Sequence, residues 1–312
     1  MTTLLEPNNR LFTLARQGKR QPSAVEAIAV VAVILVLVVI PGQMLARSLV
    51  RLILRGGIQA NSSMTVENIV GFLPAYLGMW AWLRVSIKRP FSSLGLERPD
   101  ALRRLLGGAL AAGLMIAVTA VLAVIPGGSF GPGELQKTGI AALGIGLLSL
   151  VSYAVQSSAE EVLFRGWLLP VVGSRYRPWI GVLVSTLLFS LAHGANPDIT
   201  PLAFLNLFLF GAFAAVLVLA EGSLWGACAW HAVWNWAEFA LLGFPLGGAA
   251  HEGILVSIRT AGDDIISGGT FGPEGGLAAT AVLLVAIGMV VALVHRRTQH
   301  PQNGSPGTAL NT

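Results

Sequence analysis

Two adjacent glutamates follow a long apolar stretch of this chain. Glu160 and Glu161 come soon after residues 140–155, which contain no charged side chain. Carboxylates inside a bilayer are costly and need a partner or a function. On a helix Glu161 lies one turn from Arg165 and can pair with it, whereas Glu160 points about 100° away and has no basic residue one turn from it. We therefore expect Glu161 and Arg165 to be structural and Glu160 to be free for chemistry.

Two histidines and an asparagine also occur within apolar segments. His193 ends the apolar run that begins at Trp179, and His231 precedes Asn235 by four residues. This spacing places two side chains on one face of a helix. Polar residues inside membranes also serve as hydrogen-bonded contacts between helices. His193 alone therefore fits structure and function equally, and His231 with Asn235 also fits a polar seam between helices.

Taken together, these residue types suit hydrolysis of an amide bond by an activated water. A carboxylate and a histidine that converge on one water form a general-base site. A second histidine and a side-chain amide are suitable donors to the oxyanion that develops on a carbonyl. The sequence contains no His-Glu-x-x-His zinc motif and no phosphate-binding Gly-Lys-Ser/Thr loop.

The composition indicates an integral membrane protein. The chain of 312 residues is 54% hydrophobic and 11% charged, with a mean hydropathy of +0.72. A soluble domain carries about a quarter charged residues. The net charge of +5 does not indicate nucleic-acid binding, because the basic residues lie in short loops beside apolar runs. The single cysteine, Cys228, excludes an intrachain disulfide and a multi-cysteine metal site.

The apolar runs predict an all-α, polytopic membrane bundle of about eight transmembrane helices. The expected spans lie at residues 24–40, 66–85, 106–125, 138–169, 179–193, 201–220, 224–242 and 277–294. Pro41 and Gly42 are expected to end the first span. Residues 43–57 are expected to form an amphipathic helix at the membrane interface, because its arginines recur every four residues.

The chain then divides into six expected regions. They are a cytoplasmic tail (1–23), N-terminal transmembrane helices with the interfacial helix (24–137), a membrane core with the polar residues described above (138–243), a Gly-rich extracytoplasmic loop (244–276), a last transmembrane helix (277–295) and a polar tail (296–312), disordered from Thr298. Both termini and the basic segments 84–104 and 165–177 are expected in the cytoplasm, and the acidic loop outside. The arginines of residues 43–57 are the exception to this assignment.

This arrangement raises a geometric problem for the expected site. Glu160 would lie toward the cytoplasmic side, and a full helix from Trp179 would place His193 roughly 20 Å deeper. The two side chains meet only if the helix that carries Glu160 continues well past it, or if the helix before His193 begins outside the membrane core. The sequence leaves both solutions open.

Three motifs, in this order, resemble those of the CAAX protease and bacteriocin-processing family, also called the Abi family. They are Glu160-Glu161-x-x-x-Arg165, Phe189-x-x-x-His193 and His231-x-x-x-Asn235, all in apolar segments. The resemblance covers about residues 150–242. Members of this family are intramembrane glutamic endopeptidases, so the resemblance implies a multi-pass membrane peptidase with its catalytic core in residues 138–243.

The resemblance also implies roles for single residues. Glu160 would activate the water, and His193 would help to hold and deprotonate it. His231 and Asn235 would stabilise the oxyanion. The substrate would be a peptide or protein in or at the membrane, of the CAAX type or of the bacteriocin and peptide-processing type.

By the same resemblance, Glu161 and Arg165 would support the site. No cofactor is expected, although older descriptions of the family call it a metalloprotease. Glu160, His193 and His231 could bind Zn²⁺ with one position open. We prefer the metal-free interpretation, because the spacing gives no compact pair of ligands and an asparagine is a poor zinc ligand.

Other functions remain open at this point. The motifs could form the polar packing core of a non-catalytic membrane scaffold or bacteriocin-immunity protein. A proton-coupled transporter is a third possibility, although the sequence shows no internal repeat. The expected location is a prokaryotic cell membrane with both termini in the cytoplasm, and the expected partners are the bilayer and the substrate, with no nucleic acid. The oligomeric state is left open.

Overall fold

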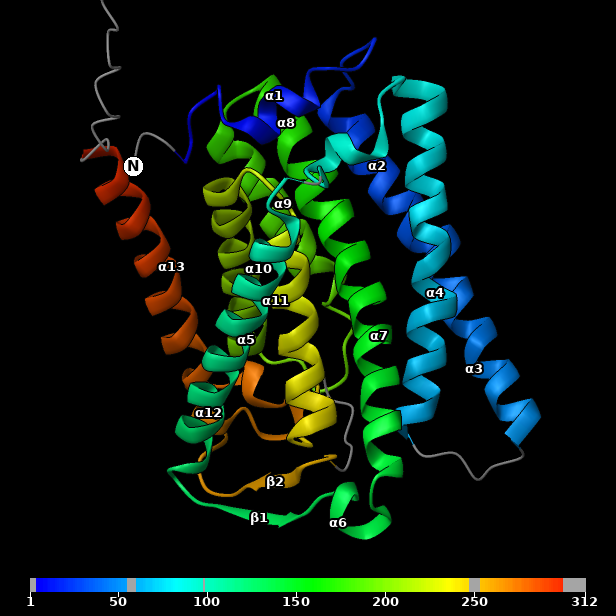
Figure 1. Cartoon of the computed structure of the whole chain (residues 1–312), viewed down its shortest axis with the longest axis vertical. Helices are drawn as coiled ribbons and strands as arrows, with labels where there is room; N and C mark the ends of the chain where they lie inside the picture. The colour runs from blue at the N-terminus through cyan, green and yellow to red at the C-terminus, as the bar shows by residue number, and fades with distance from the viewer. Residues whose placement is uncertain (1–3, 55–59, 98, 247–252, 300–312) are drawn as a thin grey trace, which may run out of the picture.

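The computed structural model describes residues 4–54, 60–97, 99–246 and 253–299. It shows long helices that run side by side, with a small two-stranded sheet across one end (Figure 1). The helices along the bundle are α2 (Ala24–Ile34), α3 (Ile40–Leu54), α4 (Ala60–Trp82), α5 (Ala101–Val124), α7 (Ala141–Glu161), α8 (Leu169–Arg175), α9 (Pro178–Ala192), α10 (Pro201–Glu221), α11 (Trp225–Asn235) and α13 (Leu277–Gln299). The sheet joins β1 (Gly128–Pro132) to β2 (Val256–Thr260) in antiparallel register, with Phe130 opposite Ile258.

Shorter elements join and extend these helices. The short α-helices are α1 (Arg10–Ala15), α6 (Glu134–Thr138) and α12 (Asp264–Ser267). Four π-helical segments, Leu35–Val39, Leu83–Ile87, Val162–Leu168 and Trp236–Leu241, continue the long helices, and 3-10 turns occur at Phe91–Leu94, Gly269–Phe271 and Pro273–Gly275. We call the end of the bundle with α1, α8 and the first turns of α2 and α9 the basic end. The end with β1, β2, α6 and α12 is called the hairpin end after the antiparallel pair of β1 and β2, two strands that lie far apart in the sequence (Figure 1).

The structure confirms an all-α polytopic membrane bundle but not the number of eight spans. Six segments of the described chain are long and apolar enough to cross a membrane: Ala24–Leu52, Met64–Ile87, Ala101–Val124, Ala141–Arg175, Pro201–Glu221 and Leu277–Gln299. The helix Pro178–Ala192 is apolar but shorter. The expected seventh span corresponds to α11 and the π-helical segment after it, most of whose side chains are buried.

The expected break at Pro41 is wrong. One 29-residue helical segment, Ala24–Leu52, replaces the short first span and the separate interfacial helix. A proline lacks an N–H and normally disrupts the preceding helical turn. Here the preceding turn, Leu35–Val39, is π-helical, and Pro41 stands in the first turn of α3. Gly42 packs against α4, where an added Cβ would lie 3.0 Å from the Cα of Gly71. The glycine therefore serves close helix packing rather than termination. The end of the predicted interfacial helix, residues 55–57, lies outside the described residues.

Three segments predicted as tails or loops contain regular structure. Within the expected N-terminal tail, α1 buries Leu11 and Phe12. The expected loop 165–177 is mostly helix, and Arg165 is buried within it. The Gly-rich region 244–276 contains β2, α12 and two 3-10 turns. Helix α13 continues to Gln299, and the disorder predicted beyond it falls on residues 300–312, outside the described residues.

The long helix Ala141–Arg175 resolves the conflict over depth. It comprises α7, the π-helical segment Val162–Leu168 and α8 without interruption. Glu160 therefore lies near its middle and not near one end. Helix α9 starts at the basic end and stops at Ala192, partway along the bundle (Figure 1). The helix thus extends well past Glu160, as the first of the two solutions requires, and this extension brings Glu160 level with His193.

Candidate active site

The Glu161–Arg165 pair forms as predicted. Arg165 Nη1 donates to Glu161 Oε1 at 3.1 Å, and both side chains are fully buried. The Arg165 guanidinium also lies 4.2 Å from the centre of the Phe189 ring. Arg165 belongs to the π-helical segment that follows α7, and such segments are frequent at functional sites. The pair lies between helices and has no access to solvent.

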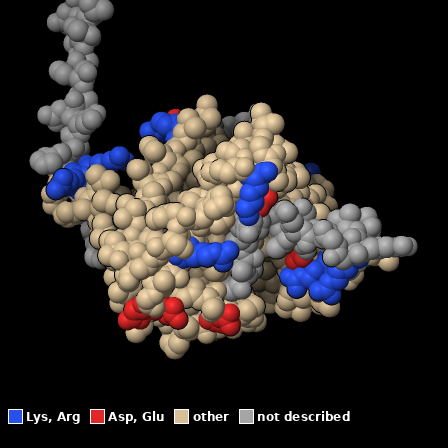
Figure 2. Space-filling model, turned by 90° about the horizontal axis from the view of Figure 1, so that it is seen from below, with Lys and Arg blue, Asp and Glu red and all other residues tan. Residues whose placement is uncertain are grey.

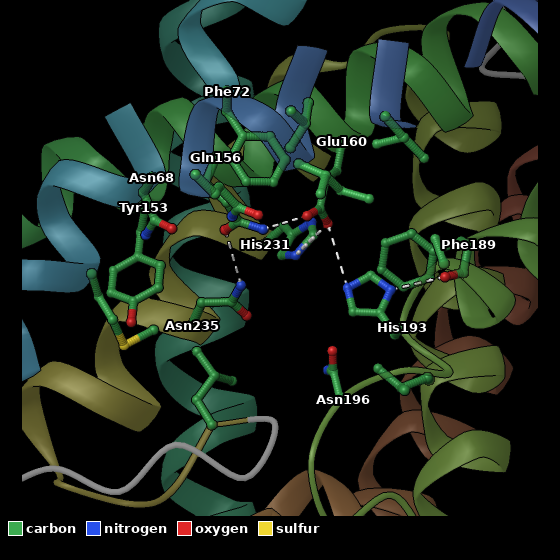
Figure 3. A pocket seen from close by; sticks show the side chains of 18 of the residues that line it. Asn68, Phe72, Tyr153, Gln156, Glu160, Phe189, His193, Asn196, His231 and Asn235 are labelled. Carbon is green, nitrogen blue, oxygen red and sulfur yellow. Dashed lines mark hydrogen bonds and ion pairs between the residues drawn. The ribbon is translucent and has the colours of Figure 1, made fainter. Parts of the chain in front are cut away.

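Glu160, His193, His231 and Asn235 line one cavity of about 550 Å³. Figure 3 shows the Glu160 carboxylate between the two imidazole rings. Its Oε2 lies 3.8 Å from His193 Nε2 and 3.8 Å from His231 Nε2. Helices α7, α9 and α11 thus bring together residues that are separated by up to 75 positions in the chain.

Each histidine is oriented by a contact at its other ring nitrogen. His193 Nδ1 lies 2.8 Å from the Phe189 carbonyl oxygen, which only accepts hydrogen bonds, so Nδ1 carries a proton. His231 Nδ1 lies 2.9 Å from Glu161 Oε1 and donates to that carboxylate. In the neutral form, both rings then present the lone pair of Nε2 to Glu160.

The two oxygens of Glu160 have different surroundings. Oε1 accepts a hydrogen bond from Gln156 Nε2 at 2.5 Å, one helical turn earlier. Oε2 is buried and has no hydrogen-bond donor among the described residues. A separation of 3.8 Å from each Nε2 is too long for a direct hydrogen bond and suits one bridging molecule.

Asn235 shares the cavity but does not contact Glu160 directly. Its Nδ2 lies 3.4 Å from Gln156 Oε1 and 3.5 Å from Ser157 Oγ, at the outer limit of hydrogen bonding. Gln156 thus contacts both Glu160 and Asn235. Spacing alone could have drawn attention to Gln156, because it lies four residues before Glu160.

Glu274 is a second cavity-lining residue that sequence reasoning missed. It lies in the 3-10 turn Pro273–Gly275 and lines the same cavity as Glu160. Its Oε1 accepts a hydrogen bond from Trp234 Nε1 at 2.9 Å, and its backbone carbonyl accepts one from Asn206 Nδ2 at 2.7 Å. Burial raises the pKa of Glu274, while His193 and His231 act in the opposite direction. Its position in a polar, Gly-rich stretch gave no sequence signal.

One short pattern escaped the sequence analysis and has no catalytic setting in the structure. Gly127-Gly128-Ser129-Phe130-Gly131 matches the Gly-x-Ser-x-Gly pattern of a serine nucleophile. A nucleophile of this type needs a sharp turn from a strand into a helix. Ser129 instead lies within β1, exposed and paired with Arg259, and does not line the cavity.

The side chains of the cavity do not meet the requirements of a zinc ion. Such a site takes about four ligands at about 2.0–2.3 Å from the metal. The described residues contain no group of three His, Cys, Asp or Glu side chains arranged to hold a metal ion. The arrangement of Glu160, His193 and His231 therefore does not fit a zinc ion as it stands.

Comparison with known proteins finds a family match for part of the chain. Residues 140–237 match the family model "Type II CAAX prenyl endopeptidase Rce1-like". An "Uncharacterized 24.3 kDa protein" of Escherichia coli is 42% identical over 67 residues, which cover 21% of this chain and 30% of that protein. "Uncharacterized protein YyaK" of Bacillus subtilis is 35% identical over 130 residues, which cover 41% of this chain and 43% of that protein.

The chain thus spans less than half the length of these curated relatives. The matched segment of the family model begins in the turn before α7 and ends just after α11. It contains all seven residues of the three motifs and excludes Glu274. The resemblance of this chain to the CAAX protease family is therefore confirmed for residues 140–237, which match the Rce1-like members of that peptidase family.

Proposed function

We propose that this protein is an intramembrane endopeptidase that hydrolyses a peptide bond with a water activated by Glu160. The observation that carries the proposal is the position of Glu160 Oε2, which lies between the Nε2 atoms of His193 and His231 at the cavity and has no hydrogen-bond donor among the described residues. A buried carboxylate oxygen without a donor is costly unless a ligand or substrate satisfies it. The match to a peptidase family supports the same conclusion.

In the proposed reaction, a water bound to Glu160 Oε2 and His193 Nε2 attacks the carbonyl carbon of the scissile bond. Glu160 takes one proton from the water as the carbon–oxygen bond forms. The resulting tetrahedral intermediate carries the negative charge on the former carbonyl oxygen. When the carbon–nitrogen bond breaks, the proton on Glu160 passes to the leaving amine, which restores the carboxylate.

The oxyanion requires hydrogen-bond donors that face the cavity. Asn235 Nδ2 can donate in any protonation state. His231 can donate from Nε2 only as an imidazolium, because its Nδ1 proton is already directed to Glu161. The Glu161 carboxylate stabilises that cationic form, as the buried aspartate does in serine-protease triads. Arg165 holds this carboxylate in place.

The test is cleavage of a quenched-fluorescence peptide library by the purified protein in detergent or nanodiscs. The wild type is compared with Glu160→Ala, with and without a chelator. Glu97→Gln is the matched control, because this carboxylate lies at the basic end in an ion pair with Arg10, away from the cavity. We expect cleavage by the wild type and the control, resistant to the chelator, and none by Glu160→Ala.

Other outcomes favour other functions. Cleavage that persists in a folded Glu160→Ala variant contradicts the proposal. Loss of cleavage with chelator, restored by Zn²⁺, indicates a metalloprotease and contradicts the metal-free mechanism. If Glu160→Gln changes the thermal unfolding and no variant cleaves any peptide in the library, the non-catalytic scaffold is favoured.

A further inference from the structure

The cavity is lined by connections from only one end of the bundle. Asn196 and Pro197 join α9 to α10, Leu246 follows the π-helical segment after α11, and Glu274 follows β2. All of these connections lie toward the hairpin end (Figure 1). None of the described lining residues comes from the connections at the basic end. The two ends of the molecule therefore differ in their access to Glu160.

The path from the basic end to Glu160 is filled by side chains. Every residue from Glu161 to Gly173 is buried. Within this stretch Trp167 donates a hydrogen bond from Nε1 to the Ala27 carbonyl, and the guanidinium of the buried Arg89 lies 5.5 Å from its ring centre. Phe12 of α1 contacts Gly173 so closely that an added Cβ would lie 2.5 Å from its ring. A peptide cannot reach Glu160 through this packing without unfolding it.

Charge distinguishes the same two ends. Exposed basic side chains concentrate at the basic end, for example Lys19, Arg84, Lys88, Arg103, Arg175 and Arg296. Figure 2 views the hairpin end, where acidic patches lie along one margin beside isolated basic patches. The described basic residues of this end are Arg47, Arg51, Lys137 and Arg259. Of these, Arg47 pairs with Glu67 and Lys137 with Glu134, so part of their charge is neutralised locally.

We infer that the catalytic cavity opens to the extracytoplasmic side of the membrane. Loops rich in Lys and Arg remain in the cytoplasm, so the basic end is cytoplasmic and the hairpin end is outside. The continuous helix Ala24–Leu52 places Arg47 and Arg51 at the hairpin end, and they remain a minority there. The cavity opening follows from the packing, and its orientation follows from the charge.

This orientation defines a class of substrate, and that part of the inference rests on the proposed peptidase function. The cavity would accept a peptide segment that is exposed on the outer face of the membrane, as in an exported or membrane-anchored polypeptide. A prenylated tail of a cytoplasmic protein would face the closed end. The apolar wall formed by Leu35, Val39 and Phe72 suits an extended segment that enters beside the membrane.

The test measures access without requiring catalysis. Cys228 is buried and is replaced by alanine, and single cysteines are introduced at three positions. Asn196→Cys reports on the cavity (Figure 3), Ser129→Cys on the outer surface of β1 and Tyr176→Cys on the exposed turn after α8. Each protein is expressed in a bacterial host, and spheroplasts are treated with a membrane-impermeant maleimide before and after permeabilisation.

We expect Ser129→Cys and Asn196→Cys to be labelled in intact spheroplasts, and Tyr176→Cys to lose labelling unless the membrane is permeabilised. Labelling of Tyr176→Cys from outside, without Ser129→Cys, overturns the orientation. If Ser129→Cys is labelled from outside and Asn196→Cys is not, the inference that the cavity opens to the outside is wrong. Pro197→Cys repeats the cavity measurement if Asn196→Cys does not accumulate. Because labelling needs no cleavage, its failure is distinct from failure of the proposed peptidase.

Discussion

Glu160 and Glu161 are neighbours in the chain but belong to two different regions of the molecule. Glu161 belongs to the sealed region, where Arg165 and His231 satisfy its Oε1, no solvent enters, and Oε2 lacks a hydrogen-bond partner among the described residues and lies away from the cavity. Glu160 belongs to the cavity region, where Oε2 faces two imidazoles and lacks a donor among the described residues. A rotation of about 100° along one helix separates the two environments. Under the proposed function, the surroundings and not the residue type would separate a supporting glutamate from a reactive one.

The largest expected effect is the loss of peptide cleavage when Glu160, but not its neighbour Glu161, loses the role of general base. Glu160→Gln keeps the side-chain shape but removes the general base, which typically contributes about 10²–10⁴-fold to the rate. We expect a loss of peptide cleavage of that order with no loss of thermal stability, because Oε2 has no hydrogen-bond donor among the described residues and a glutamine still accepts the hydrogen bond from Gln156. The measurements are single-turnover cleavage and thermal unfolding in the same detergent. A folded Glu160→Gln protein with normal cleavage would contradict the division between the regions.

The next effect concerns the stability of the sealed region. Arg165→Met leaves the buried Glu161 carboxylate without its cation, and breaking such a pair typically costs about 3–5 kcal/mol. Addition of Glu161→Gln should recover part of this loss, because no unpaired charge then remains. Reversible unfolding of the single and double variants measures both values. Equal stability of Arg165→Met and the wild type would show that the pair does not support the fold.

A smaller effect is expected within the cavity region itself. Asn235→Ala removes a neutral donor from the proposed oxyanion site, and loss of one such donor typically costs about 10²–10³-fold in kcat. KM should change little, because the charge develops only in the transition state. Ser174→Ala is the control, since its hydroxyl donates to the Val171 carbonyl and Ser174 does not line the cavity. A change in KM with unchanged kcat would instead place Asn235 in substrate binding.

The smallest effect should come from Glu274, where burial raises the carboxyl pKa. The folded state then binds a proton more tightly than the unfolded state. Stability therefore falls as the pH rises from the ordinary glutamate range through the raised pKa, and it is greatest below that range. Glu274→Gln keeps an acceptor for Trp234 and should flatten this dependence, with a small rise in Tm at the upper pH. Thermal unfolding across the pH range checks it, and identical pH profiles for both proteins would contradict it.

Parts of the structure followed from local sequence patterns. The composition and apolar runs led to a polytopic helical membrane protein, and the i, i+4 spacing led to the Glu161–Arg165 pair. Both predictions concern single helices, and the spacing at which residues share a face of an α-helix is known in advance. The break assigned at Pro41 failed for the same reason. A local rule for proline and glycine does not include the π-helical turn before Pro41 or the packing of Gly42 on α4.

The sequence alone thus determined the class of protein, because this is a property of composition, and its three motifs named Glu160, His193, His231 and Asn235 as candidates without showing that they meet. The tertiary structure decided the rest. It placed Glu274 in the cavity, directed the Nδ1 proton of His231 to Glu161, and opened the cavity toward the hairpin end. These features depend on where helices that are distant in sequence end and cross, and side-chain packing between helices determines this, with no periodic signal in the chain.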